Sequence, residues 1–324
     1  MPLDAITDKF IHTDIVGQVQ SISDRGGNLF DVRIAFATAT VGTDAAQLLN
    51  MAFGNTSLHP DVTLVGLDPP PGFPGPGHGI AGLRARANAP NRALTCAAIK
   101  PQGLPPERLA DLVERFARGG IDFVKDDHGL ADQAYSPFAR RVPLCAAAAR
   151  RTAAATGRLT HYVPSLSGNL DALRTQARIA VNEGLDTVMV APMLAGFANI
   201  QALADEFSTL ALLAHPTMGG AARIAPELLI GTLFPLIGAD AVIFPNHGGR
   251  FGYSETTCRR IAAAARAGNA LPVPAGGMTL ARVPELLAFY GPDVMLLIGG
   301  NLLQARDRLA ETTREFITRV AAAA

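Results

Sequence analysis

Short apolar runs alternate with amphipathic segments of helical length from residue 94 to the end of the chain. This alternation is typical of successive strand–helix units, which pair into a parallel sheet. Eight such units can close the sheet on itself, so the sequence predicts an α/β fold of the (β/α)8 TIM-barrel type. The predicted strands are residues 94–99, 121–124, 159–163, 187–190, 210–213, 241–244, 271–274 and 294–298.

The residues before the barrel predict a smaller α+β unit. It consists of a strand at 15–22, a turn at 24–28, a strand at 30–37 and a helix at about 44–53. The segment PPPGFPGPGHG at 69–79 is too rich in proline and glycine for a helix or a strand and marks a linker. We therefore expect a partial α+β domain over residues 1–75 and a catalytic barrel over residues 76–324.

Composition narrows the class of protein. The formal net charge is zero, and a nucleic-acid-binding face would need concentrated basic charge. The three cysteines are widely separated and lack metal-site spacing, which favours a reducing compartment. No basic segment followed by an apolar run opens the chain, and the longest apolar region is broken by Pro235 and Asp240. We expect a cytoplasmic protein that binds neither nucleic acid nor a membrane.

Lysine is rare in this chain, and two of its three lysines lie at the ends of the first two predicted barrel strands. Unlike arginine, lysine can act as a base or nucleophile, or form a carbamate with carbon dioxide. Lys100 follows the first strand, and Lys125, Asp127 and His128 follow the second, where TIM barrels place their active sites. Lys125 and Asp127, two residues apart, are expected to share a face. The alternatives are a compositional preference for arginine and a solvated charged loop.

Two glycine pairs follow the last two predicted strands, Gly276–Gly277 in PAGGM and Gly299–Gly300 in LIGGN. Barrels often bind a phosphate at this position, because backbone N–H groups exposed by glycine favour an anion. Tight turns are the alternative explanation. We predict a phosphate-ester substrate.

Further candidates follow other strands. Arg250 lies in a glycine-flanked segment that could close on an anion, although a solvated arginine is equally common. Asn246 could orient a substrate hydroxyl, whereas His247 is expected at the loop surface. His161 and His215 are taken as the ends of the third and fifth runs. Each is either a hydrogen-bonded core residue or catalytic, and function is favoured only for His215.

These motifs resemble the large subunit of RuBisCO, and in particular the form IV RuBisCO-like proteins, which do not fix carbon dioxide. The resemblance rests on QLLNMAFGN at 47–55, HGIAGLR at 78–84, IKPQGL, GGIDFVKDDHGLAD, PVPAGG and LLIGGN. It implies a ferredoxin-like N-terminal domain, of which this sequence contains only a part, and an assembly that is at least a homodimer. Either the domain is naturally short or the start of the chain has been cut.

The resemblance also implies roles for single residues. Lys125 matches the lysine that becomes a carbamate, Asp127 matches a magnesium ligand, and Lys100 matches the lysine that moves protons during enolisation. His215 resembles an active-site histidine, and the glycine pairs resemble a site for one phosphate. Asn55 resembles a substrate-contacting asparagine that a partner subunit contributes.

Departures from the family pattern restrict the reaction. His128 stands where carboxylases have a glutamate ligand, Gln102 replaces a lysine, and Pro216 replaces the arginine that holds a second phosphate. Arg250 aligns with the loop lysine that steadies carbon dioxide. These changes argue against carboxylation and favour a substrate phosphorylated at one end.

Because of His128, the identity of the metal stays open: magnesium prefers oxygen ligands, whereas histidine suits manganese, iron or zinc. Either carbamylated Lys125, Asp127 and His128 hold a divalent metal, most simply Mg²⁺, or Lys125 acts as a free amine. We expect proton abstraction and enediolate stabilisation, as in an isomerase or enolase of phosphorylated sugars. The alternatives are decarboxylation of a phosphorylated 3-keto sugar acid and a catalytically silent phosphosugar-binding protein.

Overall fold

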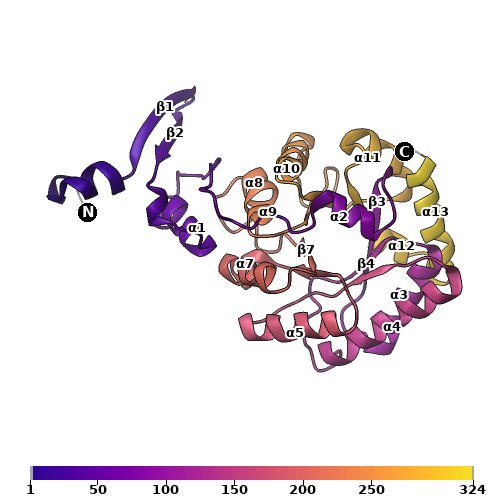
Figure 1. Ribbon diagram of the computed structural model, residues 1–324. Coiled ribbons are helices and arrows are strands. Elements are labelled where there is room, and N and C mark those ends of the chain that lie inside the picture. Colours follow the sequence, from indigo (N-terminus) through magenta and orange to yellow (C-terminus); the bar gives the residue numbers. More distant parts are fainter. Residues whose placement is uncertain (1–2, 323–324) are drawn as a thin grey trace. The chain divides into compact units, whose positions relative to one another are not determined.

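The computed structural model describes residues 3–322 (Figure 1). The chain divides between Phe73 and Pro74 into two compact units. This division lies close to the domain boundary that the proline- and glycine-rich segment predicts.

The N-terminal unit contains an antiparallel hairpin of β1 (Gln18–Gly26) and β2 (Leu29–Ala35), followed by α1 (Ala45–Phe53). The first strand starts later than predicted because Ile11–Ile15 forms a helical turn. It also extends further, since only Gly27 and Asn28 form the hairpin turn. Their φ angles are +63° and +65°, as a two-residue turn with left-handed central residues requires.

The C-terminal unit confirms the predicted TIM barrel. Within residues 3–322, one sheet has eight parallel strands in the order β5-β4-β3-β10-β9-β8-β7-β6. The edge strands meet beyond β5, where the Met189 N–H donates to the Pro164 carbonyl and the Leu166 N–H donates to the Met189 carbonyl, both at 2.8 Å. The strands are β3 (Leu94–Ile99), β4 (Phe123–Asp126), β5 (His161–Val163), β6 (Thr187–Val190), β7 (Ala211–Ala214), β8 (Ala241–Pro245), β9 (Leu271–Ala275) and β10 (Met295–Leu297).

Helices surround this sheet, and α3 packs against both α4 and α13 (Figure 1). Among residues 3–322, no helix combines the length and apolar character needed to cross a lipid bilayer. The α-helices of the unit are α2 (Gly79–Arg86), α3 (Pro106–Gly119), α4 (Phe138–Thr156), α5 (Leu170–Asn182), α6 (Pro192–Ala195), α7 (Phe197–Glu206), α8 (Pro226–Leu228), α9 (Phe234–Leu236), α10 (Glu255–Ala267), α11 (Val283–Tyr290), α12 (Gly300–Leu303) and α13 (Leu309–Ala322).

The barrel interior is filled by alternate residues of the strands. Cys96, Phe123, Leu213 and Leu297 belong to one buried apolar cluster, together with their counterparts on the other strands. Because side chains on a strand alternate between its two faces, the next residues on the same face continue this layer towards the carboxyl ends. The lumen therefore changes from apolar to polar at the ends of β3, β4 and β7.

A buried ion pair fixes the end of β4 from outside the barrel. Asp126 and Arg141 of α4 have fully buried side chains, and Arg141 Nη2 lies 3.2 Å from Asp126 Oδ2. The Tyr162 hydroxyl also donates to Asp126 at 2.6 Å, and the Ser165 N–H donates at 3.1 Å. Burial raises the pKa of Asp126, while Arg141 and these hydrogen bonds oppose that shift. One carboxylate thus joins β4 to α4 and to the segment that includes β5.

We expect Asp126→Asn to lower the free energy of unfolding by about 3–5 kcal/mol, because it leaves the Arg141 charge buried without a counter-ion. Urea denaturation followed by circular dichroism measures the change. Glu311→Gln is the control, since the Arg308–Glu311 pair is largely exposed, and its effect should stay within about 0.5 kcal/mol. A loss below about 1 kcal/mol in Asp126→Asn would contradict the anchoring role.

His161 begins β5, so its placement at the end of the third run was wrong. Its Nδ1 lies 3.0 Å from Asp186 and its Nε2 lies 2.9 Å from the Arg86 carbonyl, which makes it a hydrogen-bonded core residue. Burial raises the pKa of Asp186, but His161, Thr187 and Arg86 outweigh it, so the net pKa is lower than the usual 3.8.

A carboxyl whose pKa is lowered by folding stabilises the protein above its unfolded pKa, and this contribution is lost as the pH falls below that value. Asp186→Asn should therefore cost about 1 kcal/mol at pH 7, and the gap from the parent should close below pH 3.8. Thermal melts between pH 7 and pH 3 measure it, with Asp171→Asn as an exposed control. A gap that is independent of pH would refute the linkage.

Candidate functional site

Lys100 lies at the carboxyl end of the barrel beside the end of β4. Ala98 pairs with Lys125 in the parallel register, so Lys100 and Asp127, each two residues further on, face each other. The Lys100 Nζ is 3.0 Å from Asp127 Oδ2. A β carbon at Gly299 would lie 3.9 Å from Lys100 Cε. The amine therefore lies between Asp127 and the glycine pair that follows β10.

Lys125 is buried, with 4% of its surface exposed, and its Nζ donates to the Asp126 carbonyl at 3.0 Å. Burial lowers the pKa of Lys125, and the Lys100 charge adds to this effect, while Cys96 and the carboxylates oppose it. A lysine in this environment can supply a neutral amine, which either a base or carbamate formation requires.

Asp127 is held as a carboxylate between several donors. Burial raises its pKa, but the Gly129 N–H, the Lys100 ammonium and His128 outweigh this effect, so the net pKa is lowered. The Gly129 N–H donates to Oδ1 at 3.0 Å, and His128 Nδ1 is 3.2 Å from the same oxygen. The predicted shared face of Lys125 and Asp127 agrees with these contacts.

His128 and His215 stack with parallel rings, whose centroids are 4.7 Å apart and whose planes differ by 2°. Burial lowers the pKa of both, and with the Lys125 charge it brings the pKa of His215 to about 2. His215 is therefore neutral near pH 7. Its Nδ1 lies 2.6 Å from the Thr217 hydroxyl. Sequence analysis did not identify Thr217, although its position two residues after His215 could have suggested the contact.

The donor set fits a divalent metal on one condition. Among residues 3–322, no three His, Cys, Asp or Glu side chains converge as a ready metal site. Asp127 and His128 supply two donor atoms 3.2 Å apart, close to the ~3 Å between neighbouring ligands of an octahedral ion bound at 2.0–2.1 Å. A carbamate on Lys125 would supply the further oxygen ligand, so the fit depends on that modification.

The glycine pairs lie on the same side of the barrel as Lys100, because β10 pairs with both β3 and β9. Gly276 and Gly277 are exposed and have φ angles of +86° and +67°. Arg250 is also near the cluster, since its charge is one of the causes that lower the pKa of His128. The structure thus brings the lysines, Asp127, both histidines, the glycine pairs and Arg250 to one end of the barrel.

Asn246, His247 and Asn55 are not among the residues that the structure brings together at this end of the barrel. The Asn246 side chain accepts a hydrogen bond from the Tyr290 hydroxyl of α11 at 2.6 Å, so it points to the helix layer rather than to the lysines. His247, expected at the loop surface, is instead buried with 7% exposure, and its ring lies 4.6 Å from that of Phe289. Asn55 is exposed in the N-terminal unit, at the start of the turn Asn55–Leu58, and its contact with substrate stays a prediction.

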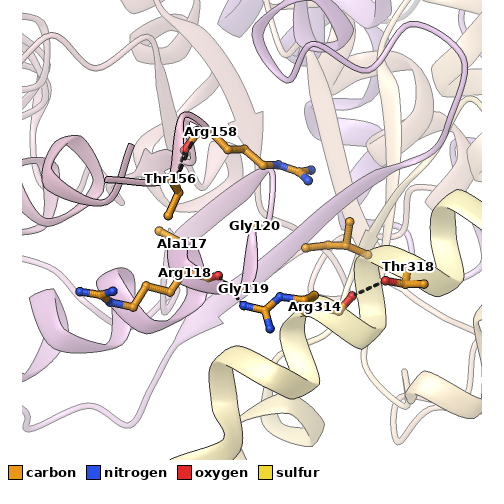
Figure 2. A pocket seen from close by; sticks show the side chains of 9 residues that line it. Ala117, Arg118, Gly119, Gly120, Thr156, Arg158, Arg314 and Thr318 are labelled. Atoms are coloured by element: carbon orange, nitrogen blue, oxygen red, sulfur yellow. Dashed lines mark hydrogen bonds between the residues drawn. The ribbon is translucent and has the colours of Figure 1, made fainter. Parts of the chain in front are cut away.

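A cavity of about 300 Å³ lies at the opposite end of the barrel, where residues precede β4 and β5 (Figure 2). Arg118, Arg158 and Arg314 line it. Arg314 donates to the Arg118 carbonyl at 3.4 Å near the end of α3, and Arg158 lies 3.2 Å from Asp122. Arginines in these positions stabilise the carboxyl ends of helices. This cavity is therefore a poor match for a phosphate site.

Known proteins match this chain over most of its length. Residues 79–256 match the family described as ribulose bisphosphate carboxylase large chain, catalytic domain. The chain is 57% identical to 5-methylthioribulose-1-phosphate isomerase of Rhodospirillum rubrum, covering 100% of this chain and 89% of the relative. It is 30% identical to 2,3-diketo-5-methylthiopentyl-1-phosphate enolase of Microcystis aeruginosa, covering 94% and 82%.

A solved structure of a RuBisCO-like protein from Rhodopseudomonas palustris superposes with a TM-score of 0.92 at 46% identity, covering 99% of this chain and 89% of that one. The resemblance seen in the lysine and glycine motifs is thereby confirmed. The chain belongs to the RuBisCO large-chain family, among its RuBisCO-like members.

Proposed function

We propose that the protein is a RuBisCO-like isomerase that moves a proton next to the carbonyl of a phosphorylated ketose, with 5-methylthioribulose 1-phosphate as its substrate. The observation that carries the proposal is the placement of Lys100 3.0 Å from Asp127, with buried Lys125 near enough for both groups to influence its pKa. The 57% identity to the isomerase of Rhodospirillum rubrum supports the substrate. A single phosphate also agrees with paired glycines on one side and Pro216 in place of a second phosphate ligand.

Lys100 is the group placed to move the proton. Its side chain is partly exposed, so a substrate in the barrel mouth can reach it. As the ammonium paired with Asp127 at 3.0 Å, Lys100 must release a proton to solvent before it can abstract one from carbon, and Asp127 then stabilises the ammonium that forms again. Returning the proton to a different carbon completes an isomerisation. Neutral His215, fixed by Thr217, can hydrogen-bond a substrate hydroxyl without competing for the proton.

Lys125, Asp127 and His128 would hold a divalent metal, Mg²⁺ or Mn²⁺, once Lys125 is carbamylated. Such a metal would stabilise the negative charge of the enediolate. Gly276, Gly277, Gly299 and Gly300 would bind the phosphate through backbone N–H groups, and Arg250 would add positive charge. In a homodimer, Asn55 of one subunit would complete the site of the other. Buried, unpaired cysteines support a cytoplasmic location.

Enolisation of a diketo phosphate is the second candidate, because it passes through the same type of intermediate and is the activity named for a relative at 30% identity. Assays of both substrates in deuterium oxide distinguish the two reactions. Carbon dioxide release from a phosphorylated 3-keto sugar acid would favour a decarboxylase instead. No turnover and no deuterium incorporation would favour a silent binding protein.

We expect Lys100→Arg and Lys125→Arg each to lower kcat by about 10²–10⁴-fold, because arginine stays protonated and cannot act as a base or form the carbamate. Conversion of 5-methylthioribulose 1-phosphate and solvent deuterium incorporation measure the loss. Lys9→Arg is the matched control, since Lys9 is the third lysine and is exposed in the N-terminal unit. Parent-like exchange in both site variants would reject the mechanism.

Removal of metal should show whether Lys125 works as a carbamate or as a free amine. We expect dialysis against EDTA to abolish most activity, and Mg²⁺ or Mn²⁺ with bicarbonate to restore it, because a carbamate completes the ligand set. Nuclear magnetic resonance with ¹³C-bicarbonate should show a carbamate signal that Lys125→Arg lacks. Full activity after metal removal, with no such signal, would instead establish Lys125 as a free amine.

A further inference from the structure

The loops that follow β8 and β9 contact each other through their backbones. A β carbon at Gly277 would lie 2.7 Å from Cα of Gly249, and one at Gly249 would lie 3.0 Å from the Gly276 carbonyl oxygen. Such separations leave no room for side chains, so glycine is required where the loops touch. One loop carries Arg250 and the other carries the Gly276–Gly277 pair.

Arg282 directly precedes α11 and hydrogen-bonds to both of these loops. Its Nη1 donates to the carbonyls of His247 and Gly277, both at 3.2 Å. Its Nε and Nη2 donate to the two oxygens of Glu285 at 3.2 and 2.8 Å. The Arg282 side chain is 22% exposed, whereas its partner Glu285 is 54% exposed.

The guanidinium of Arg282 is fixed in orientation by the two-point contact with Glu285. A planar group held in this way presents its remaining N–H donors in a set direction, which a lysine ammonium cannot reproduce. We propose that Arg282 is a positioning residue that locks the Arg250 loop against the glycine-pair loop, so that both act on the same anionic group of the substrate. This inference rests on the proposed function, in which these loops bind the phosphate.

The base and the tip of the Arg250 loop differ in packing. His247 at the base is buried against Phe289, and Cys258 of α10 lies 3.4 Å from the Pro245 carbonyl. Arg250 and Phe251 at the tip are exposed, with the guanidinium 4.7 Å from the Phe251 ring centre. Loosening the Arg282 contacts should therefore release the tip while leaving the barrel folded.

Trypsin provides a readout of the loop that does not depend on activity, because it cleaves after arginine and Arg250 is exposed. Arg282→Gln removes the positive charge and the paired N–H donors of the guanidinium. We expect cleavage after Arg250 to accelerate about fivefold in this variant, as loss of about 1 kcal/mol of hydrogen bonding predicts. Mass spectrometry identifies the cleavage site. Arg308→Gln is the matched control, since Arg308 pairs with Glu311 at the same i,i+3 spacing away from the loops.

The KM for 5-methylthioribulose 1-phosphate should rise about tenfold in Arg282→Gln, while kcat changes less than about threefold. Arg282→Lys should keep the positive charge but leave the KM raised, because an ammonium cannot bridge two carbonyls and Glu285 together. Faster cleavage with an unchanged KM would overturn the positioning role, and so would parent-like cleavage in a folded Arg282→Gln protein.

The result expected if only the role of Arg282 is wrong differs from the result expected if the proposed function is wrong. In that case the parent would not turn over the substrate, and millimolar inorganic phosphate would not slow tryptic cleavage after Arg250. The Arg282→Gln variant would still be cleaved faster than the parent. Phosphate protection in the parent that is lost in Arg282→Gln supports both the phosphate site and the positioning role.

Discussion

The ion pair between Asp126 and Arg141 determines which charged side chains reach the barrel lumen. Successive residues of a strand point to opposite faces, so anchoring Asp126 outside the barrel turns Lys125 and Asp127 inwards. A slip of one residue in β4 would bury both of these charges against α4 and expose Asp126 to the lumen. The chemistry at the carboxyl end of the barrel therefore depends on a contact in the helix layer.

The charges that converge on the lumen favour an anionic ligand. Lys100 and Arg250 are cationic, Asp127 is a carboxylate, and the stacked histidines are kept neutral by burial and nearby lysines. With Lys125 as a neutral amine the cluster carries a net positive charge, which suits a phosphorylated substrate. Carbamylation would give Lys125 a negative charge and create a demand for a divalent cation. The two states of one lysine thus select different ligands.

The barrel was predictable because its buried parallel strands are continuous apolar runs bounded by loops. The lysine cluster followed from the position of its residues at strand ends. The outward direction of Asn246 was missed, although strand alternation from lumen-facing Ile243 implies it. The burial of His247 depends on Phe289, more than 40 residues away in sequence, and no local pattern reveals a contact of that kind.

His128 links the two chemical states of the site. Its Nδ1 cannot donate a hydrogen to Asp127 and offer a lone pair to a metal at the same time. Without a metal the Nδ1–H can hydrogen-bond to the Asp127 carboxylate 3.2 Å away, whereas the same nitrogen would have to lose that hydrogen to bind a metal. The low pKa that burial imposes on His128 favours the neutral ring that both states require. The resemblance implies a glutamate ligand at this position in carboxylases, so a metal held by His128 would have a neutral donor in its place and would depend more strongly on a carbamate at Lys125.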